Sequence, residues 1–516
     1  MKHLFLRISF AVIILLSACA TPKSVSTPDN GQISITFLQV NDVYEIAPIE
    51  SGKTGGMARV ATLKKQLLKK NPNTFLVMAG DFLSPSVYNS LAYEGKRIRG
   101  RQMVESMNAA GTDIVVFGNH EFDISETELQ SRINESSFKW IASNSFHKTA
   151  AGVFPFNKAT AARAEDIPQT MVLTVTDADG TSAKIGLIGI NIPFNKASYV
   201  AYTDPLETAT NLYNQLKDSC DYIVAITHQL LKDDILLAQK LPGLAMILGG
   251  HEHDMQYRQV GDVIITKAHA NARSAYVAEL NINKKKGTKK VSATLKLLDN
   301  SVVLDSVTNT VVQKWTNIAE KNYASLGFDA SKVVLKKGDA LEARESLIRK
   351  QPTNFSRLII NAMEQASPGA DVAIVNSGSI RLDDVLQAPV TQYDIIRSLP
   401  FGGSIVEAEM KGSLLKQILE AGRKNAGIGG FLHYSSAVFY DAINQQWTYK
   451  KMPIADDIIL KVAVTDFLLT GGEANLAFLT KDNPGLTKVL PVYTALSDPR
   501  SDIRLAIIKY MEGLNQ

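Results

Sequence analysis

The chain has 516 residues, of which 45% are hydrophobic and 21% are charged, which predicts two or three domains with a sizeable buried core. The formal net charge is +4, and two of its positive charges, Lys2 and Arg7, lie in a segment that we expect to be removed. A balance this close to neutral gives no electrostatic reason to expect a nucleic-acid or acidic-membrane partner.

The first residues predict a targeting segment. A basic start precedes the apolar run 10–16, which is too short to span a bilayer. The following Leu16-Ser17-Ala18-Cys19 resembles a bacterial lipobox, which implies a signal peptide over residues 1–18 and lipidation at Cys19; an ordinary cleaved signal is the alternative. Residues 19–32 predict a flexible tether. Since no other segment is apolar and long enough to cross a membrane, we expect a lipid-anchored protein of the cell envelope, at the periplasmic face of the outer membrane.

Cys220 is the second of the two cysteines. With Cys19 lipidated it has no partner within the chain, so no disulfide framework is expected. Its apolar flanks predict a buried thiol and not a nucleophile.

Short apolar runs alternate with stretches of helical period over residues 33–305. The runs have the length of buried strands, and the pattern predicts an α/β domain in which helices cover both faces of the strands. The strand-like runs are 35–40, 74–79, 114–117, 223–227 and 245–248, and the clearest helical stretches are 58–70 and 101–110. The basic run 284–290 predicts a solvated hairpin turn, because no aromatic residues are interleaved to stack on nucleic acid.

The rest of the chain predicts a connecting helix and a second domain. A helical pattern over 305–325 indicates a connecting helix, and residues 306–332 are interpreted as this helix and a hinge. Residues 333–516 are predicted to form a smaller α+β domain. Its expected strands are 373–375, 438–440 and 459–464, and its expected helices are 357–365 and 413–421.

Each strand-like run of the first domain ends in polar residues. Because strand ends meet at one edge in α/β sheets, these residues are expected to gather there. Carboxylates, amides and imidazoles suit Mn, Mg, Zn or Fe. The motifs at the strand ends are Asn41-Asp42, Gly80-Asp81, Gly118-Asn119-His120-Glu121-Phe122-Asp123, Thr227-His228 and Gly250-His251-Glu252-His253. Each motif alone is commonly a turn or a surface segment, and only the ordered set favours a metal site.

This set resembles the calcineurin-like metallophosphatases, and its longer motifs resemble the 5'-nucleotidases. The resemblance implies a four-layer α/β/β/α sandwich followed by a 5'-nucleotidase C-terminal domain. It also implies two divalent metal ions (Mn, Zn, Mg, Co or Fe) and attack on a phosphate by a metal-activated water. The implied roles are a bridging Asp81, one ion on Asp42 and His253, the other on Asn119, His228 and His251, and a catalytic dyad of His120 oriented by Asp123.

Tyr44 is a departure from the family pattern, which usually has His at that place. A phenol oxygen binds a metal only when it is deprotonated, so either Tyr44 is a ligand to a strongly acidic ion or water takes its place. The identity and occupancy of the first metal are therefore open at this stage.

The second domain carries three loops that resemble the substrate loops of 5'-nucleotidases. The first presents Asn376 and Arg381, and the others present the aromatic residues Phe401 and Phe467. Two aromatic rings can stack on a flat base, and arginine suits phosphate or ribose oxygens. By resemblance, the substrate-binding residues are Arg349, Asn376, Arg381, Phe401, Phe467 and Glu473. Glu473 stands where the family has Asp.

We therefore expect a hydrolase of phosphate esters of nucleotides, acting on small molecules and not on nucleic acid. One alternative keeps the fold and changes the substrate to a UDP-sugar, a cyclic nucleotide or another ester. The other is a non-catalytic nucleotide-binding lipoprotein, which the His120–Asp123 pair disfavours. The sequence makes no prediction of an oligomeric state.

Overall fold

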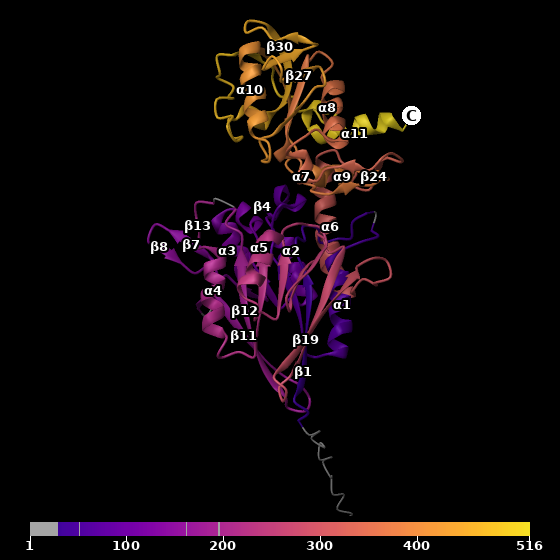
Figure 1. Cartoon of the computed structure of the whole chain (residues 1–516). Helices are drawn as coiled ribbons and strands as arrows, with labels where there is room; N and C mark the ends of the chain where they lie inside the picture. Colours follow the sequence, from indigo (N-terminus) through magenta and orange to yellow (C-terminus); the bar gives the residue numbers. More distant parts are fainter. Residues whose placement is uncertain (1–28, 51, 161–162, 195–196, 516) are drawn as a thin grey trace, which may run out of the picture.

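The computed structural model describes residues 29–50, 52–160, 163–194 and 197–515. The expected signal peptide, Cys19 and most of the expected tether lie outside these residues. Figure 1 shows two domains stacked end to end and joined at a narrow waist, with the N-terminal domain below and the C-terminal domain above.

The first domain is built on two sheets. One has the order β19(Thr288–Leu297)-β18(Ser274–Asn283)-β1(Gln32–Val40)-β2(Thr74–Ala79)-β5(Ile114–Val116)-β6(Lys139–Ile141). The other has the order β11(Thr170–Thr176)-β12(Ser182–Asn191)-β14(Tyr222–His228)-β15(Met246–Gly250)-β17(Val263–Lys267)-β16(Gln256–Val260). Strands β1, β2, β5 and β6 are parallel, as are β12, β14, β15 and β17. The predicted strands of this domain are therefore present, and each begins and ends close to its expected bounds.

Alternate side chains of the central strands face opposite sides, as the pleat of a strand requires. In β2, Val77 points between the two sheets, where it packs with Val224 and Leu248 of the second sheet. Its neighbour Met78 points outward into a core shared with the helices of that side. Both faces of these strands are apolar, which explains their continuous hydrophobic runs.

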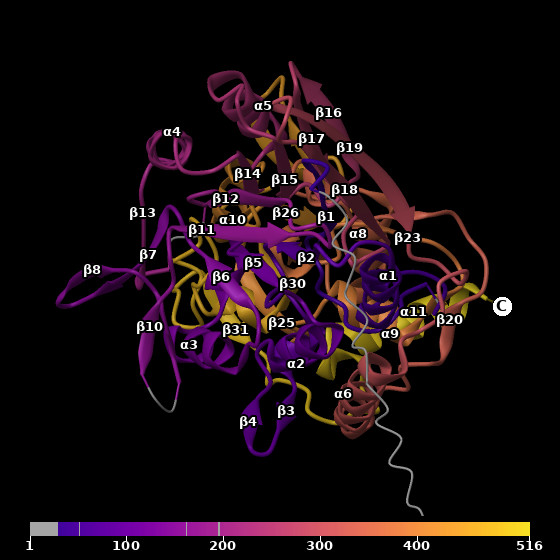
Figure 2. The ribbon, with the colours of Figure 1, turned by 90° about the horizontal axis from the view of Figure 1, so that it is seen from below.

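The helices cover only the outer faces of the two sheets (Figure 2). Helices α1(Met57–Lys70), α2(Arg101–Ala110) and α3(Glu126–Glu135) lie outside the first sheet, and α4(Pro205–Leu216) and α5(Leu231–Lys240) lie outside the second. The expectation of helices on both faces of each strand is wrong. The sequence of an apolar strand face is the same whether a helix or another sheet covers that face. Here the inner faces of the two sheets pack against each other. The result is the four-layer α/β/β/α sandwich.

Strand direction places the carboxyl ends of the parallel strands at the waist. β1 begins at the lower end of the first domain and runs toward the second domain (Figure 1). β2 is parallel to it, with Val40 opposite Met78. The loops that follow these strands therefore face the C-terminal domain.

Smaller elements decorate the sandwich. Residues of η1(Val87–Ser90), β4(Lys96–Arg97) and η2(His120–Asp123) line a cleft at the waist, and β3(Ala92–Tyr93) pairs with β4. Strands β7(Ser145–Thr149), β8(Gly152–Phe154) and β13(Val200–Tyr202) form a small sheet at the side of the domain (Figure 1), and β9(Asn157–Ala159) pairs with β10(Ala164–Asp166). Residues 284–287 of the basic run form the exposed turn that was expected between the antiparallel strands β18 and β19, and residues 288–290 begin β19. Cys220 is a free thiol, but it is half-buried against the α4–α5 core and not fully buried as predicted.

The long helix α6(Ser306–Ser325) follows the first domain, where a helix was expected. It packs on α1 and α2 of the first domain, with Val312 and Trp315 fully buried. Within the described residues, no helix combines the length and the apolar character needed to cross a bilayer.

The second domain is an α+β unit around a small mixed sheet. The sheet has the order β26(Leu432–Tyr434)-β22(Val372–Asn376)-β30(Ile459–Thr465)-β25(Ile405–Lys411)-β31(Leu486–Val489). The short strands are β20(Val333–Leu335) with β24(Val390–Thr391), β21(Leu341–Glu342) with β23(Val385–Leu386), and β27(Val438–Asp441), β28(Gln446–Tyr449) and β29(Met452–Pro453). The helices are α7(Glu345–Ile348), α8(Asn354–Ala366), η3(Ser377–Ser379), α9(Gln392–Ser398), α10(Gly412–Lys424), η4(Asp466–Leu469), η5(Pro499–Ser501) and α11(Ile503–Leu514). All strands and helices predicted here are found.

Candidate metal centre and active site

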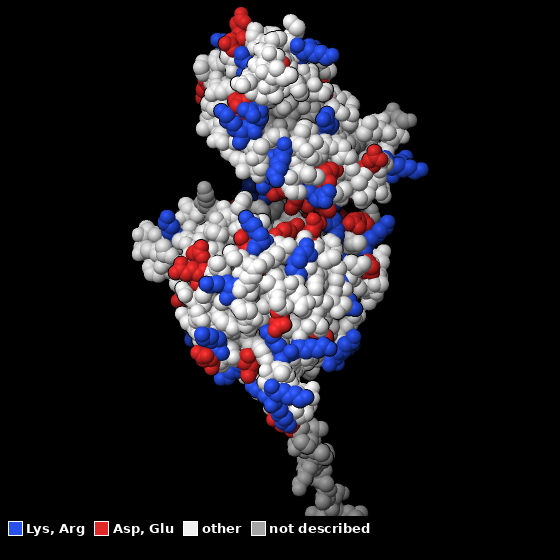
Figure 3. Space-filling model, viewed as in Figure 1, with Lys and Arg blue, Asp and Glu red and all other residues white. Residues whose placement is uncertain are grey.

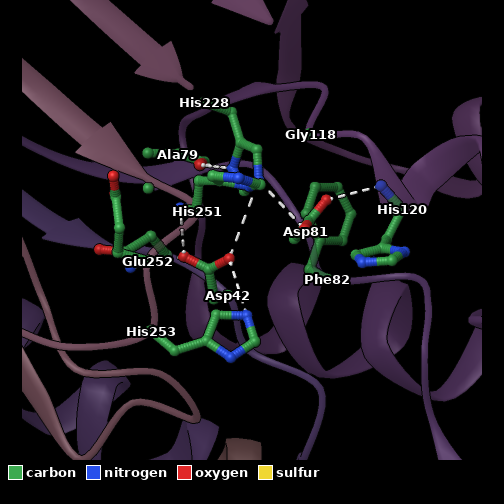
Figure 4. Close-up of polar contacts among 12 residues, drawn as sticks. Asp42, Ala79, Asp81, Phe82, Gly118, His120, His228, His251, Glu252 and His253 are labelled. Carbon is green, nitrogen blue, oxygen red and sulfur yellow. Dashed lines mark hydrogen bonds and ion pairs between the residues drawn. The ribbon is translucent and has the colours of Figure 1, made fainter. Parts of the chain in front are cut away.

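Polar side chains from both sheets meet at the waist end of the sandwich. They follow β1, β2 and β5 of the first sheet and β14 and β15 of the second, so five strand ends contribute. Figure 4 shows the imidazoles of His228, His251 and His253 around the carboxylates of Asp42 and Asp81. Thus the expected convergence is real, although it spans two sheets and not one.

The distances among these groups suit a bound cation. Nε2 of His228 lies 3.0 Å from Oδ2 of Asp81 and 3.8 Å from Oδ1 of Asp42. Nε2 of His253 lies 3.4 Å from the same Asp42 oxygen. One ligand atom each from Asp81, His228 and His251 lies within 4.8 Å of the others. These are the kinds of donors that hard and borderline divalent metals take.

Two buried atoms of this cluster make no hydrogen bond to any described residue. They are Nε2 of His228, whose contact with Asp81 lacks hydrogen-bond geometry, and Oδ1 of Asn119. A buried polar atom without a partner costs free energy, and such atoms in a native site call for a further ligand such as an ion. Both atoms belong to residues that the family resemblance assigns to one ion, so the donor set fits a metal.

The electrostatics of the cluster also favour a cation. Burial would raise the pKa of Asp42 and of Asp81, yet positive charge on His228 and on its neighbours holds both below their usual values. Burial opposes the charged form of His228, but the two carboxylates raise its pKa to about 9. Burial and the charge on His228 lower the pKa of His251 to about 4. The two buried carboxylates therefore favour positive charge close to them, which a metal ion can supply.

The backbone is strained at the ligand positions. Asp42, Asp81, His251 and His253 have φ values of 53°, 57°, 96° and 59°. Residues other than glycine adopt this left-handed region at a free-energy cost, and such positions cluster at functional sites. The strain is held by local hydrogen bonds: the His251 N–H donates to Oδ2 of Asp42 at 2.9 Å, and the His120 N–H donates to Oδ1 of Asp81 at 2.8 Å.

Glycines next to the ligands permit the close approach of the loops. A Cβ on Gly118 would lie 2.1 Å from Oδ1 of Asp81, and a Cβ on Gly250 would lie 2.4 Å from the carbonyl oxygen of Ala79. Both distances are shorter than a Cβ atom and a non-bonded oxygen can approach each other. The glycines of the Gly-Asn-His and Gly-Gly-His motifs therefore allow the first and second sheets to bring their ligands together.

Tyr44 points into the metal cluster. Its hydroxyl lies 3.0 Å from Nε2 of His253, 3.3 Å from Oδ2 of Asp81 and 3.5 Å from Oδ1 of Asp42. Burial and the two nearby carboxylates hold the pKa of the phenol well above its usual value. The phenol thus lies among the expected ligands of the first cation, in surroundings that disfavour its phenolate form.

His120 and Asp123 form the expected pair beside the cluster. Nδ1 of His120 lies 2.6 Å from Oδ2 of Asp123, in the short helix η2. Burial lowers the pKa of His120, but the charges of Asp81 and Asp123 outweigh this effect and raise it. A protonated imidazole at this place can donate a hydrogen bond to a charged substrate oxygen.

A cleft of about 1000 Å³ opens between the two domains at this edge. Of the residues expected at the site, Asn119, His120, Asp123 and His251 line it from the first domain. Arg349, Arg381 and Phe401 line it from the second domain. Nη2 of Arg381 lies 4.0 Å from Oδ2 of Asp123, so cations of the second domain face the dyad. The volume fits a nucleotide-sized ligand.

Three expected substrate residues, Asn376, Phe467 and Glu473, are not among the described residues that line this cleft. Nδ2 of Asn376 donates to Oε2 of Glu473 at 2.6 Å, which ties two of the substrate loops together. Phe467 is half-exposed on η4, and its loop contacts the Phe401 loop because the Asp466 N–H donates to the Ser404 oxygen at 2.9 Å. The structure thus brings the three loops together but does not place both rings on the cleft wall.

Two carboxylates with clear roles were not assigned from the sequence. Glu121 is fully buried and accepts hydrogen bonds from the backbone N–H groups of Asp81, Phe82, Leu83 and Gly118. It therefore fixes the loops after β2 and β5. Asp383 of the second domain contacts His253 through Nδ1 of the imidazole at 2.7 Å. Glu121 lies inside a recognised motif, whereas nothing in the sequence near Asp383 marks it.

The calcineurin-like phosphoesterase profile matches residues 35–255, which contain most of the sandwich, up to the end of β15, and all the metal-site residues above. The profile of the 5'-nucleotidase C-terminal domain matches residues 333–480. Fold, site and profiles define a metallophosphoesterase, a hydrolase that acts on phosphoric ester bonds and binds divalent metal.

Comparisons of the whole chain with individual proteins agree with this class of protein. The 5'-nucleotidase of Bos taurus is 24% identical over 509 residues, covering 85% of this chain and 83% of its own length. The trifunctional nucleotide phosphoesterase YfkN of Bacillus subtilis is 23% identical over 504 residues, covering 87% of this chain, which spans 33% of that longer protein. The 5'-nucleotidase precursor of Thermus thermophilus has the same fold, with a TM-score of 0.67 at 20% identity over 93% of this chain and 97% of that one. The chain thus joins a calcineurin-like phosphoesterase domain to a 5'-nucleotidase C-terminal domain, and it is similar to 5'-nucleotidases over most of its length.

Proposed function

We propose that this protein releases phosphate from nucleotides by metal-dependent hydrolysis. The observation that carries the proposal is the shared cleft, which has a volume of about 1000 Å³. Residues of the metal cluster and the dyad line it from the first domain, and Arg349, Arg381 and the exposed ring of Phe401 line it from the second. An ester phosphate at the cluster and a flat base near Phe401 would fill the two ends of this cleft. The relatives named above as nucleotidases support this choice of substrate.

The proposed metal centre holds two divalent cations. Asp81 would contact both, with Asp42 and His253 on one side and Asn119, His228 and His251 on the other. When bound, the pair would lower the pKa of a water and stabilise charge on the entering and leaving oxygens. Asp42 and Asp81 are buried, with pKa values below the usual range, and the hydrogen bonds of Glu121 fix the loop that carries Asp81.

Residues outside the metal centre bind the substrate and stabilise the transition state. His120, held by Asp123, donates a hydrogen bond to a phosphoryl oxygen as charge develops in the transition state. Arg381 lies 4.0 Å from Asp123 and presents a guanidinium that can hold a second phosphate oxygen or a ribose oxygen. Phe401, which is 65% exposed, offers a ring face for the base.

The direct test is phosphate release by protein that has been stripped of metal and reloaded separately with Mn, Zn, Mg, Co or Fe. The substrates are nucleoside mono-, di- and triphosphates, cyclic nucleotides and a nucleotide sugar. Turnover of a monophosphate with a preferred metal is the expected result. Turnover confined to the nucleotide sugar or the cyclic nucleotides would keep the fold and replace the substrate. Absence of turnover with metal bound would reject the enzymatic proposal.

We also propose that the protein is anchored to the cell envelope by lipid at Cys19, at the periplasmic face of the outer membrane. The lipobox-like Leu16-Ser17-Ala18-Cys19 supports this proposal. Metabolic labelling with a fatty acid should mark the wild-type protein and not Cys19→Ser. Equal labelling, or equal release of both from the membrane fraction, would contradict it.

A further inference from the structure

His253 is in contact with the second domain. It follows β15 of the first domain, and Asp383 lies in the loop before β23 of the second. Nδ1 of His253 is 2.7 Å from Oδ2 of Asp383, and the two side chains are 17% and 23% exposed. An ion pair or hydrogen bond of this length in a partly buried place is strong compared with exposed surface pairs.

The carboxylate of Asp383 is fixed in its position. Its other oxygen, Oδ1, accepts a hydrogen bond from the N–H of Glu345 at 2.6 Å, at the start of α7. The backbone of Asp383 is in the left-handed region, with φ at 45°. A non-glycine residue is held in that region only when its surroundings impose it, and this is common at functional sites.

The other imidazole nitrogen of His253 faces the metal cluster. Nε2 is 3.4 Å from Oδ1 of Asp42 and 3.0 Å from the Tyr44 hydroxyl. In a neutral imidazole one nitrogen donates and the other carries the lone pair. A carboxylate at Nδ1 takes the N–H there and leaves the lone pair on Nε2, directed at the cluster. Carboxylates that orient metal-binding histidines in this way commonly lie behind the ligands of metal sites.

We propose that Asp383 is a positioning residue of the metal centre: it orients His253 across the domain junction and so gives the second domain a direct hold on cation binding. The inference rests on the proposed role of His253 as a ligand. Loss of such a supporting carboxylate typically lowers metal affinity about 10- to 100-fold.

The neighbouring Asp384 provides a matched control. It too belongs to the second domain and forms an ion pair with the first, through Nη2 of Arg273. It does not contact His253 in the described structure. Removing Asp384 therefore weakens the domain junction without disturbing the imidazole, whereas removing Asp383 does both.

The test is calorimetric titration of the metal-stripped full chain with Mn²⁺ and, separately, with Zn²⁺. The variants are Asp383→Ala, Asp383→Asn, Asp384→Ala and His253→Ala. We expect Asp383→Ala to lower the affinity for the weaker-bound cation about 10- to 100-fold, approaching His253→Ala, with Asp384→Ala close to wild type. Asp383→Asn keeps the shape and an acceptor oxygen, so it should retain part of the affinity and show that the site still folds.

Equal losses in the Asp383→Ala and Asp384→Ala variants would overturn the proposal in favour of a general effect of domain docking. Wild-type affinity in both Asp383 variants, with a loss in His253→Ala, would also overturn it. Wild-type cation affinity in the His253→Ala variant would show that His253 is not a metal ligand, and the proposal for Asp383 would then fail. Failure of the nucleotidase proposal would look different, because the cation titrations would follow the expected order while no nucleotide released phosphate.

Discussion

At the scale of single residues, Tyr44 is where this metal centre differs from the histidine that the family resemblance places there. Its hydroxyl sits among Asp42, Asp81 and His253, yet its pKa is held well above the usual value by burial and by the carboxylates. A phenol binds a metal only when it is deprotonated, and these surroundings disfavour the phenolate. We therefore expect Asp42, Asp81 and His253 to be the main ligands of the first cation.

Replacing Tyr44 by histidine should strengthen this site. Tyr44→His supplies a neutral imidazole nitrogen, and we expect the affinity for the weaker-bound cation to rise about tenfold, which corresponds to ~1.4 kcal/mol. Titration of the metal-stripped protein measures it. Tyr44→Phe removes the hydroxyl and adds no donor, so it should bind cations as wild type does. A large loss of affinity in Tyr44→Phe would show instead that the phenolate is a ligand.

Removing the imidazole of His120 should affect turnover and not metal binding. We expect His120→Ala to lower kcat about 10²- to 10⁴-fold, the range for a positioned proton or hydrogen-bond donor. Cation affinity should not change, because the side chain points to Asp123 and the cleft. His147 pairs with Glu126 at 2.6 Å outside the site, so His147→Ala is the control. An unchanged kcat in His120→Ala would contradict the assignment of the dyad.

The residues of the metal cluster could be predicted because each follows a recognisable apolar strand, and their order along the chain resembles one family. Asp383 could not be predicted in this way. It follows no strand-like run and lies 130 positions after its partner His253, so only the packing of the two domains brings them together. Phe467 was predicted from its loop motif, but its half-exposed position beside the cleft depends on the arrangement of the loops.

At the scale of elements, the loop after β1 and the helix α9 form a buried polar contact between the domains. The Tyr393 hydroxyl donates to Oε2 of Glu45, and Arg397 lies on the same helix. Glu45 is 5% exposed, and burial raises its pKa from the usual 4.5 to about 7 despite the hydrogen bond from Tyr393 and the charge of Arg397.

This contact predicts a pH dependence of stability. A folded-state pKa above the unfolded-state value means that the folded chain binds this proton more tightly. The contribution of protonated Glu45 is complete below pH 4.5 and is lost as the pH rises to about 7. At ~1.4 kcal/mol per unit of pKa, the loss amounts to at most ~3 kcal/mol. Glu45→Gln, which stays neutral, should be close to wild type at pH 4.5 and more stable than wild type at pH 8.

Denaturant unfolding of both proteins at the two pH values measures this difference. The replacement Glu50→Gln serves as a control, because Glu50 is an exposed residue of the same segment. A constant difference between Glu45→Gln and wild type across this pH range would contradict the prediction.

The strands and helices were predictable because their apolar runs are long and bounded by polar or glycine residues; β2 and α2 match their expected ranges. The layering could not be predicted from these runs. Val77 and Met78 are equally apolar, but one packs on the other sheet and the next on a helix core. The apolar runs therefore specify only that both faces are buried, whereas the family resemblance predicted the four-layer α/β/β/α order that the structure has.

At the scale of the whole molecule, the cleft depends on how the two domains are oriented. The expected connecting helix and hinge are residues 306–332, which comprise α6 and the segment that follows it. Contacts across the junction include Arg273 with Asp384 and His253 with Asp383. Figure 3 shows carboxylates gathered at the waist, where these contacts lie.

A hinge predicts that ligands change the domain arrangement. Small-angle scattering of the metal-loaded protein should differ between the free state and saturation with a non-hydrolysable nucleotide analogue. A nucleotide analogue that contacts both domains would bind one domain orientation more tightly and would increase the fraction of molecules in that orientation. Identical scattering curves under saturation would contradict the hinge and favour a fixed cleft.

The direction of β1 has a further consequence for a protein held by its N-terminus. The strand begins at the lower end of the first domain and ends at the waist, and its nine residues span about 30 Å. A lipid at Cys19 would therefore attach the chain at the end opposite the cleft. The first domain would act as a pedestal that holds the cleft away from the lipid headgroups, and the second domain could turn in open fluid without meeting the bilayer.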